Sequence, residues 1–378
     1  MDVVIPLSLY IHTPWCVQKC PYCDFNSHNI KHEPDYTQYI EHLLCDLKQD
    51  LKLTNGRSIH SIFIGGGTPS LFSADLIAHL LKEIQNIIPF ESDIEITIEA
   101  NPNSVEADRF AGYILAGVNR ISIGIQSFQA EKLTQLGRVH SPEEAIKAAN
   151  LAKELKINSF NLDLMHGLPN QSCQDALLDL KRAIEINPPH LSWYQLTIEP
   201  NTLFGSKPPI LPDEDCLWDI YQQGHQLLIE NGYQQYETSA YAKPGYQCKH
   251  NLNYWHFGDY LGIGCGAHGK LTQPDGKIIR TIKTRHPKGY MEGRYSEKTY
   301  TVPIDEIPFE FFMNQFRLHE AASKQQFIER TNLTLPIIEK SIHQAIKSGY
   351  LTEDQDYWYL TEKGHLFLNS LLELFLEN

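Results

Sequence analysis

Three cysteines near the N-terminus carry the clearest sign of chemistry in this sequence. Cys16, Cys20 and Cys23 are spaced C-x3-C-x2-C and follow a strand-like run at residues 7–12. Cysteine thiolates at such short spacing are the usual ligands of iron–sulfur clusters. Because no fourth cysteine lies close by, one iron of a four-iron cluster would stay open. The spacing therefore predicts a cluster whose open iron binds an exchangeable or reactive ligand.

Two other interpretations of these cysteines remain open. Structural zinc takes four ligands, and His12 or His28 would complete a set of three cysteines and one histidine. Free cysteines are also often buried in a core without any ligand role. The spacing, with Tyr22 before the last cysteine, favours the cluster over both.

Composition sets the broad class of the protein. The chain has 378 residues, 42% hydrophobic and 21% charged, which is ordinary for a globular protein of one large and one smaller domain. A net charge of −14 without a long basic run argues against nucleic-acid binding. Eight cysteines are too sparse for a disulfide scaffold, and no signal peptide or 18-residue apolar run is visible, so we expect a cytoplasmic protein.

Short β-branched runs alternate with amphipathic stretches over the first half of the chain. Repeated β-then-α units imply parallel strands with right-handed crossovers. Six units predict an α/β fold, a partial (β/α)6 barrel over residues 1–198, with an open doubly wound sheet as the alternative. The strand candidates are residues 7–12, 58–64, 94–99, 120–125, 159–164 and 191–196.

The second half of the chain has a different character. Residues 199–300 are rich in Pro, Gly and Tyr and form a predicted extension. Residues 301–378 read as helices, then a hairpin at 350–360 and a final helix at 363–376, which is a winged-helix-like α+β arrangement. The acidic balance of the chain favours packing or protein contact over DNA binding for this region.

Polar and glycine residues follow four of the predicted strands. In parallel α/β folds, ligands bind at the C-terminal ends of the strands, which meet at one edge. Consecutive glycines let the backbone approach a ligand closely, and a carboxylate can accept both hydroxyls of a ribose. We therefore expect one pocket lined by the loop Gly65–Pro69 and by Glu99, Gln126, Arg138 and Asp163.

This set of motifs resembles the radical S-adenosylmethionine (SAM) proteins, and within them the branch of oxygen-independent coproporphyrinogen III oxidase. The resemblance implies that the three cysteines hold a [4Fe–4S] cluster and that SAM occupies its open iron. It implies that Glu99 binds the ribose of SAM and Arg138 its carboxylate. By the same resemblance, the rest of the SAM pocket comprises Tyr10, Gly66, Gly67, Thr68, Gln126 and Asp163.

Two features depart from the oxidases of this branch. Those oxidases have a fourth cysteine two residues after the third, where this chain has Phe25, which cannot ligate iron. Residues 250–255 read H-N-x-x-Y-W, in which His250 beside two aromatic rings could ligate heme. A structural histidine beside an aromatic turn is the alternative for an isolated motif. Both features resemble the HemW family of heme chaperones.

The resemblance favours a heme chaperone over an enzyme, so no catalytic residue is assigned. It implies cluster, SAM and heme as bound groups, His250 as heme ligand, and acceptor hemoproteins as partners, membrane respiratory enzymes among them. Cys248 and His268 are weaker candidates for a second axial ligand. The sequence leaves open the acceptor, covalent attachment of heme, cleavage of SAM and a homodimer.

Two alternative functions belong to other classes. A radical-SAM enzyme acting on a porphyrin would form product from coproporphyrinogen III. A winged-helix regulator with a cluster sensor would retain DNA at low salt.

Overall fold

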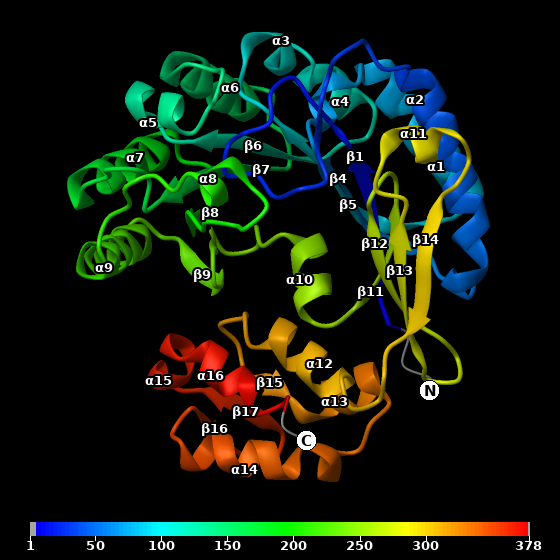
Figure 1. Ribbon diagram of the computed structural model, residues 1–378, viewed down its shortest axis with the longest axis vertical. Helices are drawn as coiled ribbons and strands as arrows, with labels where there is room; N and C mark the ends of the chain where they lie inside the picture. Colours follow the sequence, from blue (N-terminus) through cyan, green and yellow to red (C-terminus); the bar gives the residue numbers. More distant parts are fainter. Residues whose placement is uncertain (1–4, 377–378) are drawn as a thin grey trace.

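The computed structural model describes residues 5–376, apart from the side chains of residues 104 and 105. A curled sheet with helices on its outer side forms an open barrel, and a smaller lobe lies against its lower side (Figure 1). The parallel part confirms the predicted (β/α)6 barrel. Its six predicted strands are β1 (Leu7–Thr13), β4 (Ile59–Gly66), β5 (Phe90–Ala100), β6 (Arg120–Gln126), β7 (Ser159–His166) and β8 (His190–Gln195).

The segment 199–300 adds strands to both edges of this sheet. Beside β1 lies a seventh parallel strand, β11 (Asp259–Ile263), which the sequence did not predict. Three antiparallel strands continue from it: β12 (His268–Thr272), β13 (Ile278–Lys283) and β14 (Ser296–Thr301). At the other edge, β8 pairs with β10 (Ala240–Ala242), which pairs with β9 (Gln234–Glu237).

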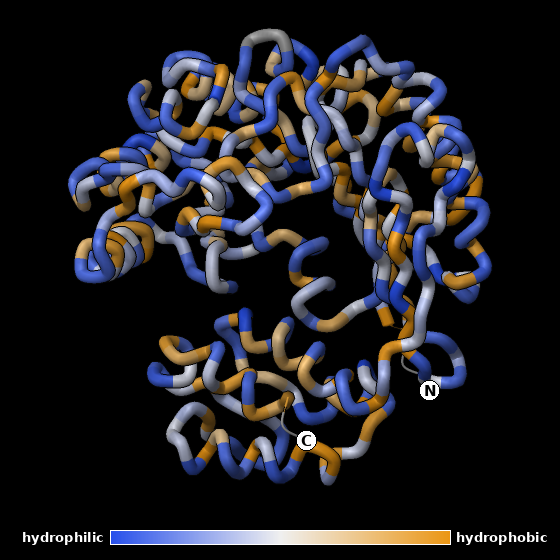
Figure 2. Tube along the Cα trace, in the orientation of Figure 1, coloured by the Kyte–Doolittle hydropathy of each residue, from blue (hydrophilic) through white to orange (hydrophobic). Residues whose placement is uncertain are grey.

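The outer helices begin at side-chain caps and bury one apolar stripe each. Asp35, Ser73 and Ser141 accept hydrogen bonds from the first turns of their helices. In α2, Ile77, Leu80, Leu81 and Ile84 form the buried stripe expected of an amphipathic helix, and Figure 2 shows the apolar strands that such stripes cover. The helices of this layer include α1 (Tyr36–Asp50), α2 (Ala74–Ile87), α4 (Phe110–Leu115), α6 (Pro142–Glu154), α7 (Cys173–Ile186) and α9 (Glu214–Glu230).

The smaller lobe has its own aromatic core, in which Phe312 stacks on Phe327 and contacts Trp358. The predicted hairpin is present as β16 (Leu351–Glu353) and β17 (Tyr357–Leu360), and with the short β15 (Ala322–Ser323) it makes a three-stranded sheet. The helices are α12 (Ile307–Gln315), α13 (Lys324–Thr331), α14 (Glu339–Lys347), α15 (Glu362–Leu366) and α16 (Leu368–Glu373).

The prediction of one final helix over 363–376 was wrong. The chain leaves the helical region at Phe367, where φ is −113° and ψ is 39°, and so divides into α15 and α16. Among residues 5–376, no helix is both long and apolar enough to cross a bilayer.

A short segment after α12 holds the two lobes together. Leu318 forms a β-bridge with Glu237, and the backbone N–H of His319 donates to the Tyr236 carbonyl at 3.0 Å. The guanidinium of Arg317 lies 4.5 Å from the ring centroid of Trp255. Trp255 ends α10 (Lys249–Trp255), which crosses between the sheet edges near the smaller lobe (Figure 1).

Candidate cofactor site at the barrel mouth

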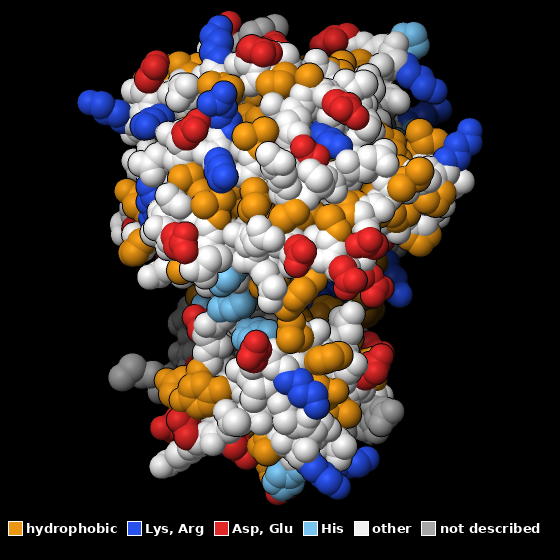
Figure 3. Space-filling view, turned by 90° about the vertical axis from the view of Figure 1, so that its left-hand side faces the viewer, with side chains coloured by type: hydrophobic (Ala, Val, Ile, Leu, Met, Phe, Trp, Pro, Cys, Tyr) orange, Lys and Arg blue, Asp and Glu red, His pale blue; other side chains and the backbone are white. Residues whose placement is uncertain are grey.

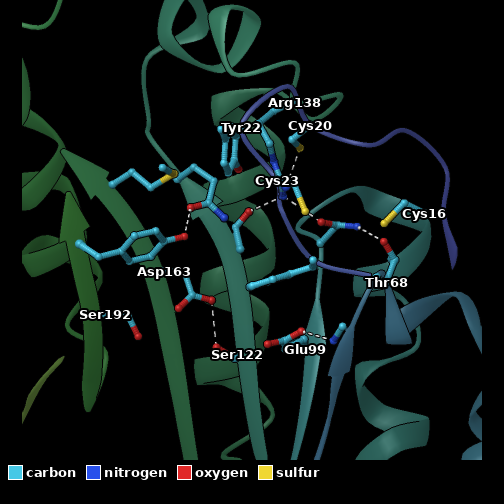
Figure 4. Close-up of a pocket in the computed structure, with 18 of the residues that line it drawn as sticks. Cys16, Cys20, Tyr22, Cys23, Thr68, Glu99, Ser122, Arg138, Asp163 and Ser192 are labelled. Carbon is cyan, nitrogen blue, oxygen red and sulfur yellow. Dashed lines mark hydrogen bonds between the residues drawn. The ribbon is translucent and has the colours of Figure 1, made fainter. Parts of the chain in front are cut away.

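One cavity of about 700 Å³ runs from the C-terminal ends of the parallel strands toward α10. It collects residues that are far apart in the sequence, because each βα loop of the barrel opens at the same end. Figure 4 shows polar side chains from several strands pointing into this space. Its lining includes Cys16, Cys20, Cys23, Gly66, Gly67, Thr68, Glu99, Asn101, Gln126, Arg138, Asp163, Tyr194, Asn251 and Trp255.

The three cysteines lie on the loop between β1 and α1, which is ordered by its own hydrogen bonds. The short strands β2 (Trp15–Cys16) and β3 (His28–Asn29) pair across the loop. Asn26 fixes its far side by donating to the carbonyls of Cys265 and Arg285, each at 2.9 Å. The cysteine thiols are therefore presented from a rigid loop and are all free.

The geometry fits a cluster better than a zinc ion. Among the described residues, no group of three or more His, Cys, Asp or Glu side chains is placed to hold one metal ion. Four-iron clusters do not need such convergence, because each cysteine binds a different iron. His12 is engaged on both ring nitrogens, with Tyr10 Oη and the Asn26 carbonyl each at 2.9 Å, so it is not free to complete a zinc site.

The glycine loop after β4 packs directly against the start of the cysteine loop. Gly66 has φ +111°, and a Cβ there would lie 2.5 Å from His12 Cε1. A Cβ on Gly67 would lie 2.5 Å from the Trp15 carbonyl oxygen. Only glycine fits both positions, and this brings Thr68 into the cavity beside Cys16 (Figure 4).

Glu99 is the penultimate residue of β5 and accepts a hydrogen bond from the Gly66 N–H at 3.1 Å. Burial, with the nearby charge of Asp163, raises the pKa of Glu99 to about 8. A buried carboxylate with few donors of its own is stabilised when a ligand supplies hydroxyl donors. The Glu99 side chain is therefore placed to accept hydrogen bonds from the hydroxyl groups of a ligand.

Asp163 on β7 is better satisfied than Glu99. Its carboxylate accepts from Ser122 Oγ at 3.0 Å and from Asn161 Nδ2 at 2.7 Å. Burial still raises its pKa. Next to it, Gln126 adopts φ +69° and accepts from the Tyr194 hydroxyl at 2.8 Å, which holds the amide toward the cavity.

Arg138 brings a positive charge to the cysteine loop. Its Nη2 donates to Asn101 Oδ1 at 2.8 Å and to the Gly124 carbonyl at 2.7 Å, and its Nη1 lies 3.6 Å from Cys20 Sγ. This guanidinium can therefore meet a carboxylate placed between the cysteines and β6.

The structure brings most predicted SAM-site residues together, with one exception. Tyr10 is not part of the cavity lining; its hydroxyl faces His12 and its ring stacks on Phe63. Sequence reasoning assigned no role to Asn101 and Tyr194, which line the cavity. Asn101 follows a predicted strand and Tyr194 lies near the C-terminal end of one, and that position was a signal that could have found them.

His250 lies inside the protein rather than on the cavity wall. It is 8% exposed, its Nδ1 lies 3.0 Å from Ser61 Oγ, and its ring centroid is 5.2 Å from that of Phe63. Burial, with the charge of Arg120, lowers the pKa of His250 to about 3. Glu95 accepts from the His250 N–H at 3.1 Å and so fixes the start of α10.

Two other residues of the H-N-x-x-Y-W motif face the cavity, whereas the ring of Tyr254 packs against Tyr260. Asn251 and Trp255 line the cavity, and the indole Nε1 of Trp255 has no partner among the described residues. Of the two candidates for a second axial ligand, Cys248 is buried with its thiol 3.4 Å from Glu95 Oε1, and His268 lies on β12.

Comparison with known proteins gives consistent matches over the whole chain. A sequence model of the radical SAM superfamily matches residues 10–181, and one of the HemN C-terminal domain matches residues 302–367. The chain is 65% identical to "Heme chaperone HemW" of Escherichia coli strain K12, over 98% of each chain. It is 63% identical to the protein of the same name from Haemophilus influenzae, over 100% of this chain and 99% of the other.

A solved structure has the same fold. Coproporphyrinogen III oxidase (HemN) from Escherichia coli superposes with a TM-score of 0.84, over 99% of this chain and 90% of that chain, at 24% identity.

Proposed function

Because this chain belongs to the HemW family of heme chaperones, we propose that it binds heme and passes it to acceptor hemoproteins. The observation that carries the proposal is the family identity along nearly the full length, including the region of residues 250–255. The family also has a [4Fe–4S] cluster and SAM as its cofactors, and the cavity at the barrel mouth supplies residues of suitable chemistry for both.

The cluster would be held by Cys16, Cys20 and Cys23. When bound, such a cluster with SAM supplies one-electron chemistry. The protein's contribution is a rigid loop of three thiols, with the Arg138 guanidinium beside Cys20 to offset negative charge.

SAM would be held along the ends of β4 to β7. Glu99 would accept the ribose hydroxyls, and Arg138 would meet the carboxylate of the methionyl group. The glycine loop would approach that group with its backbone, and Gln126 and Asp163 would close the pocket. The raised pKa of Glu99 supports this assignment, since the carboxylate lacks the donors that Asp163 already has.

Phe25 bears on enzyme activity. It stands two residues after Cys23, is 58% exposed and lines the mouth of the cavity. A phenyl ring supplies no ligand and no thiol, so we propose that the chain is not a coproporphyrinogen III oxidase. Anaerobic incubation of the cluster-loaded protein with coproporphyrinogen III and SAM should then give no product, and turnover would refute this part of the proposal.

We place heme binding at the H-N-x-x-Y-W motif, with His250 as the iron ligand. Trp255 supports this location, because its indole faces the cavity and could cover a macrocycle. The burial of His250 means that α10 must shift before its imidazole reaches iron. We therefore expect slow heme uptake that changes the environment of Trp255.

The test is an anaerobic heme titration of the cluster-loaded chain, followed by absorbance, on the wild type and two variants. His250→Ala removes the proposed ligand, whereas Ser61→Ala removes only its hydrogen-bond partner and keeps the imidazole. A saturable binding phase of about one heme per chain that His250→Ala weakens and Ser61→Ala keeps supports the proposal, whether or not a second phase is present. A wild type without specific heme binding contradicts it.

The proposed acceptors are heme-requiring proteins such as respiratory enzymes, reached from the cytoplasm. All eight cysteines of the chain are free, which accords with a reducing compartment.

A further inference from the structure

Two histidines meet at the waist between the lobes, away from the cavity. The rings of His319 and His365 stack with centroids 4.6 Å apart and an interplanar angle of 8°. His319 belongs to the segment after α12, and His365 lies on α15. Both are exposed, and Figure 3 shows histidine side chains gathered at the waist on this side of the molecule.

The backbone fixes both residues while leaving their rings free. The N–H of His319 donates to the Tyr236 carbonyl on the barrel, and the N–H of His365 donates to the Thr361 carbonyl, each at 3.0 Å. Among the hydrogen bonds of residues 5–376, none involves a ring nitrogen of either histidine. Each ring contacts the other, but its nitrogens are not used in a hydrogen bond, so a ring nitrogen is available to a ligand.

The imidazoles are in the form that binds metals. Partial burial, together with repulsion from His365 and His225, lowers the pKa of His319 to about 4. Burial also lowers the pKa of His365. At neutral pH both rings therefore keep a free nitrogen lone pair.

The surroundings favour an apolar ligand that carries its own metal. Leu366 and Phe367 follow His365 directly and are 51% and 52% exposed. Figure 3 shows hydrophobic side chains on the smaller lobe just below the waist. Such surface suits a flat macrocycle better than a hydrated ion.

A bare metal ion fits this place less well than an iron porphyrin. Structural sites for zinc use four protein ligands, and the described residues contain no group of three suitable side chains. The porphyrin supplies four nitrogens itself, so its iron needs only one axial imidazole, which either of the two parallel rings can supply while the other packs against it.

We propose that His319 and His365 form an exposed docking site for heme iron, at which heme is taken up or handed over. This inference rests on the proposed chaperone function and goes beyond it by assigning a second heme site outside the H-N-x-x-Y-W motif. An exposed site can be reached by an acceptor surface directly, whereas the ring of His250 cannot.

The experiment is an anaerobic hemin titration of the full-length, cluster-loaded chain. The variants are His319→Ala, His365→Ala and the double variant, with His343→Ala as the control. His343 lies on α14 of the same lobe and is also exposed. Circular dichroism and thermal melting verify the fold, and because the replaced rings are exposed we expect unchanged melting.

The inference predicts that the double variant loses one binding phase or binds that heme at least tenfold more weakly, while His343→Ala matches the wild type. The phase that remains should be the one that His250→Ala removes. Unchanged binding in the double variant overturns the inference, even when the wild type binds heme. Absence of specific heme binding in the wild type instead overturns the proposed function itself.

A parallel titration with Zn²⁺ alone separates heme from bare metal. Weak Zn²⁺ binding that the double variant does not alter supports a heme site. Tight Zn²⁺ binding that the double variant abolishes, with heme binding intact, would make the pair a metal-ion site and contradict the inference.

Discussion

The two ends of the barrel, the mouth and the lower end around Ser61 and His250, differ in whether their polar side chains are available to a ligand. At the mouth, the cysteine thiols, Thr68 and Glu99 face an open cavity and have few partners. At the lower end, Ser61 hydrogen-bonds both His250 and Ser8, so the polar groups there satisfy one another. The mouth can therefore bind a ligand without rearrangement, whereas the lower end must open before the imidazole of His250 can ligate iron.

The same contrast applies to the histidines. His250 carries the recognisable motif but is buried and hydrogen-bonded. His319 and His365 carry no motif, but they are exposed and stack on each other, and within the described part of the chain their ring nitrogens accept or donate no hydrogen bond. A motif identifies a segment of chain; the fold decides which of its side chains reaches a ligand.

The largest expected effect concerns the mouth. Cys16→Ser should abolish the cluster, because a hydroxyl is a poor substitute for a thiolate on iron. The chain should still fold, since the loop is held by backbone and Asn26 contacts. Iron content and visible absorbance after reconstitution measure the loss, and Cys45→Ser, at an exposed cysteine of α1, is the control. A cluster that survives in Cys16→Ser would remove this residue from the ligand set.

The next effect concerns the lower end. His250→Ala should lower the free energy of unfolding by about 3 kcal/mol, because it deletes a buried ring and leaves Ser61 with one partner fewer. Denaturant unfolding measures this change. His343→Ala should stay within about 0.5 kcal/mol of the wild type. Equal stability of the two variants would mean that His250 is not packed as described.

At the mouth, the environment of Glu99 predicts that the stability of the chain depends on pH. The pKa of Glu99 in the folded chain, about 8, lies above its ordinary value of 4.5, so the native state holds the extra proton between these values. The stability that this proton supports is present below pH 4.5 and lost as the pH rises through 8. Without SAM, Glu99→Gln should therefore be more stable than the wild type at pH 9, on the order of 2 kcal/mol, and about equal at pH 4.5.

The same substitution should stabilise the chain at pH 9 but weaken its binding of SAM. Glu99→Gln should bind SAM more weakly at pH 9, where only the wild type offers a carboxylate to the ribose. Calorimetric titration with SAM at pH 7 and pH 9 measures this. A variant that is less stable than the wild type at pH 9 would contradict the unsatisfied environment described for Glu99.

The smallest effect is expected at Tyr194. Replacing it with phenylalanine removes the hydroxyl that donates to Gln126 and should cost about 1 kcal/mol of stability. SAM affinity should fall only a few-fold, because Gln126 keeps its backbone position. Loss of all SAM binding would show that Tyr194 contacts the ligand itself.

Most of the parallel strands and the mouth residues could be predicted, because β-branched runs and strand-end polar residues follow local rules. The pairing of β11 with β1 joins segments about 250 residues apart, and no local pattern encodes it. The burial of His250 depends on Phe63 and Ser61 from β4, and the stacking of His319 on His365 depends on how the segment after α12 packs against α15. These contacts are tertiary, so the sequence pattern could not supply them.

We propose that this chain delivers heme to an acceptor rather than merely binding it. The direct measurement is the rate at which the heme-loaded, cluster-loaded chain loses heme to membranes from heme-depleted cells, compared with an apomyoglobin trap. If the chain delivers heme, the rate should rise with the amount of membrane and exceed the rate with the trap. A rate equal to that of the trap at every amount of membrane would show passive dissociation and contradict the chaperone function.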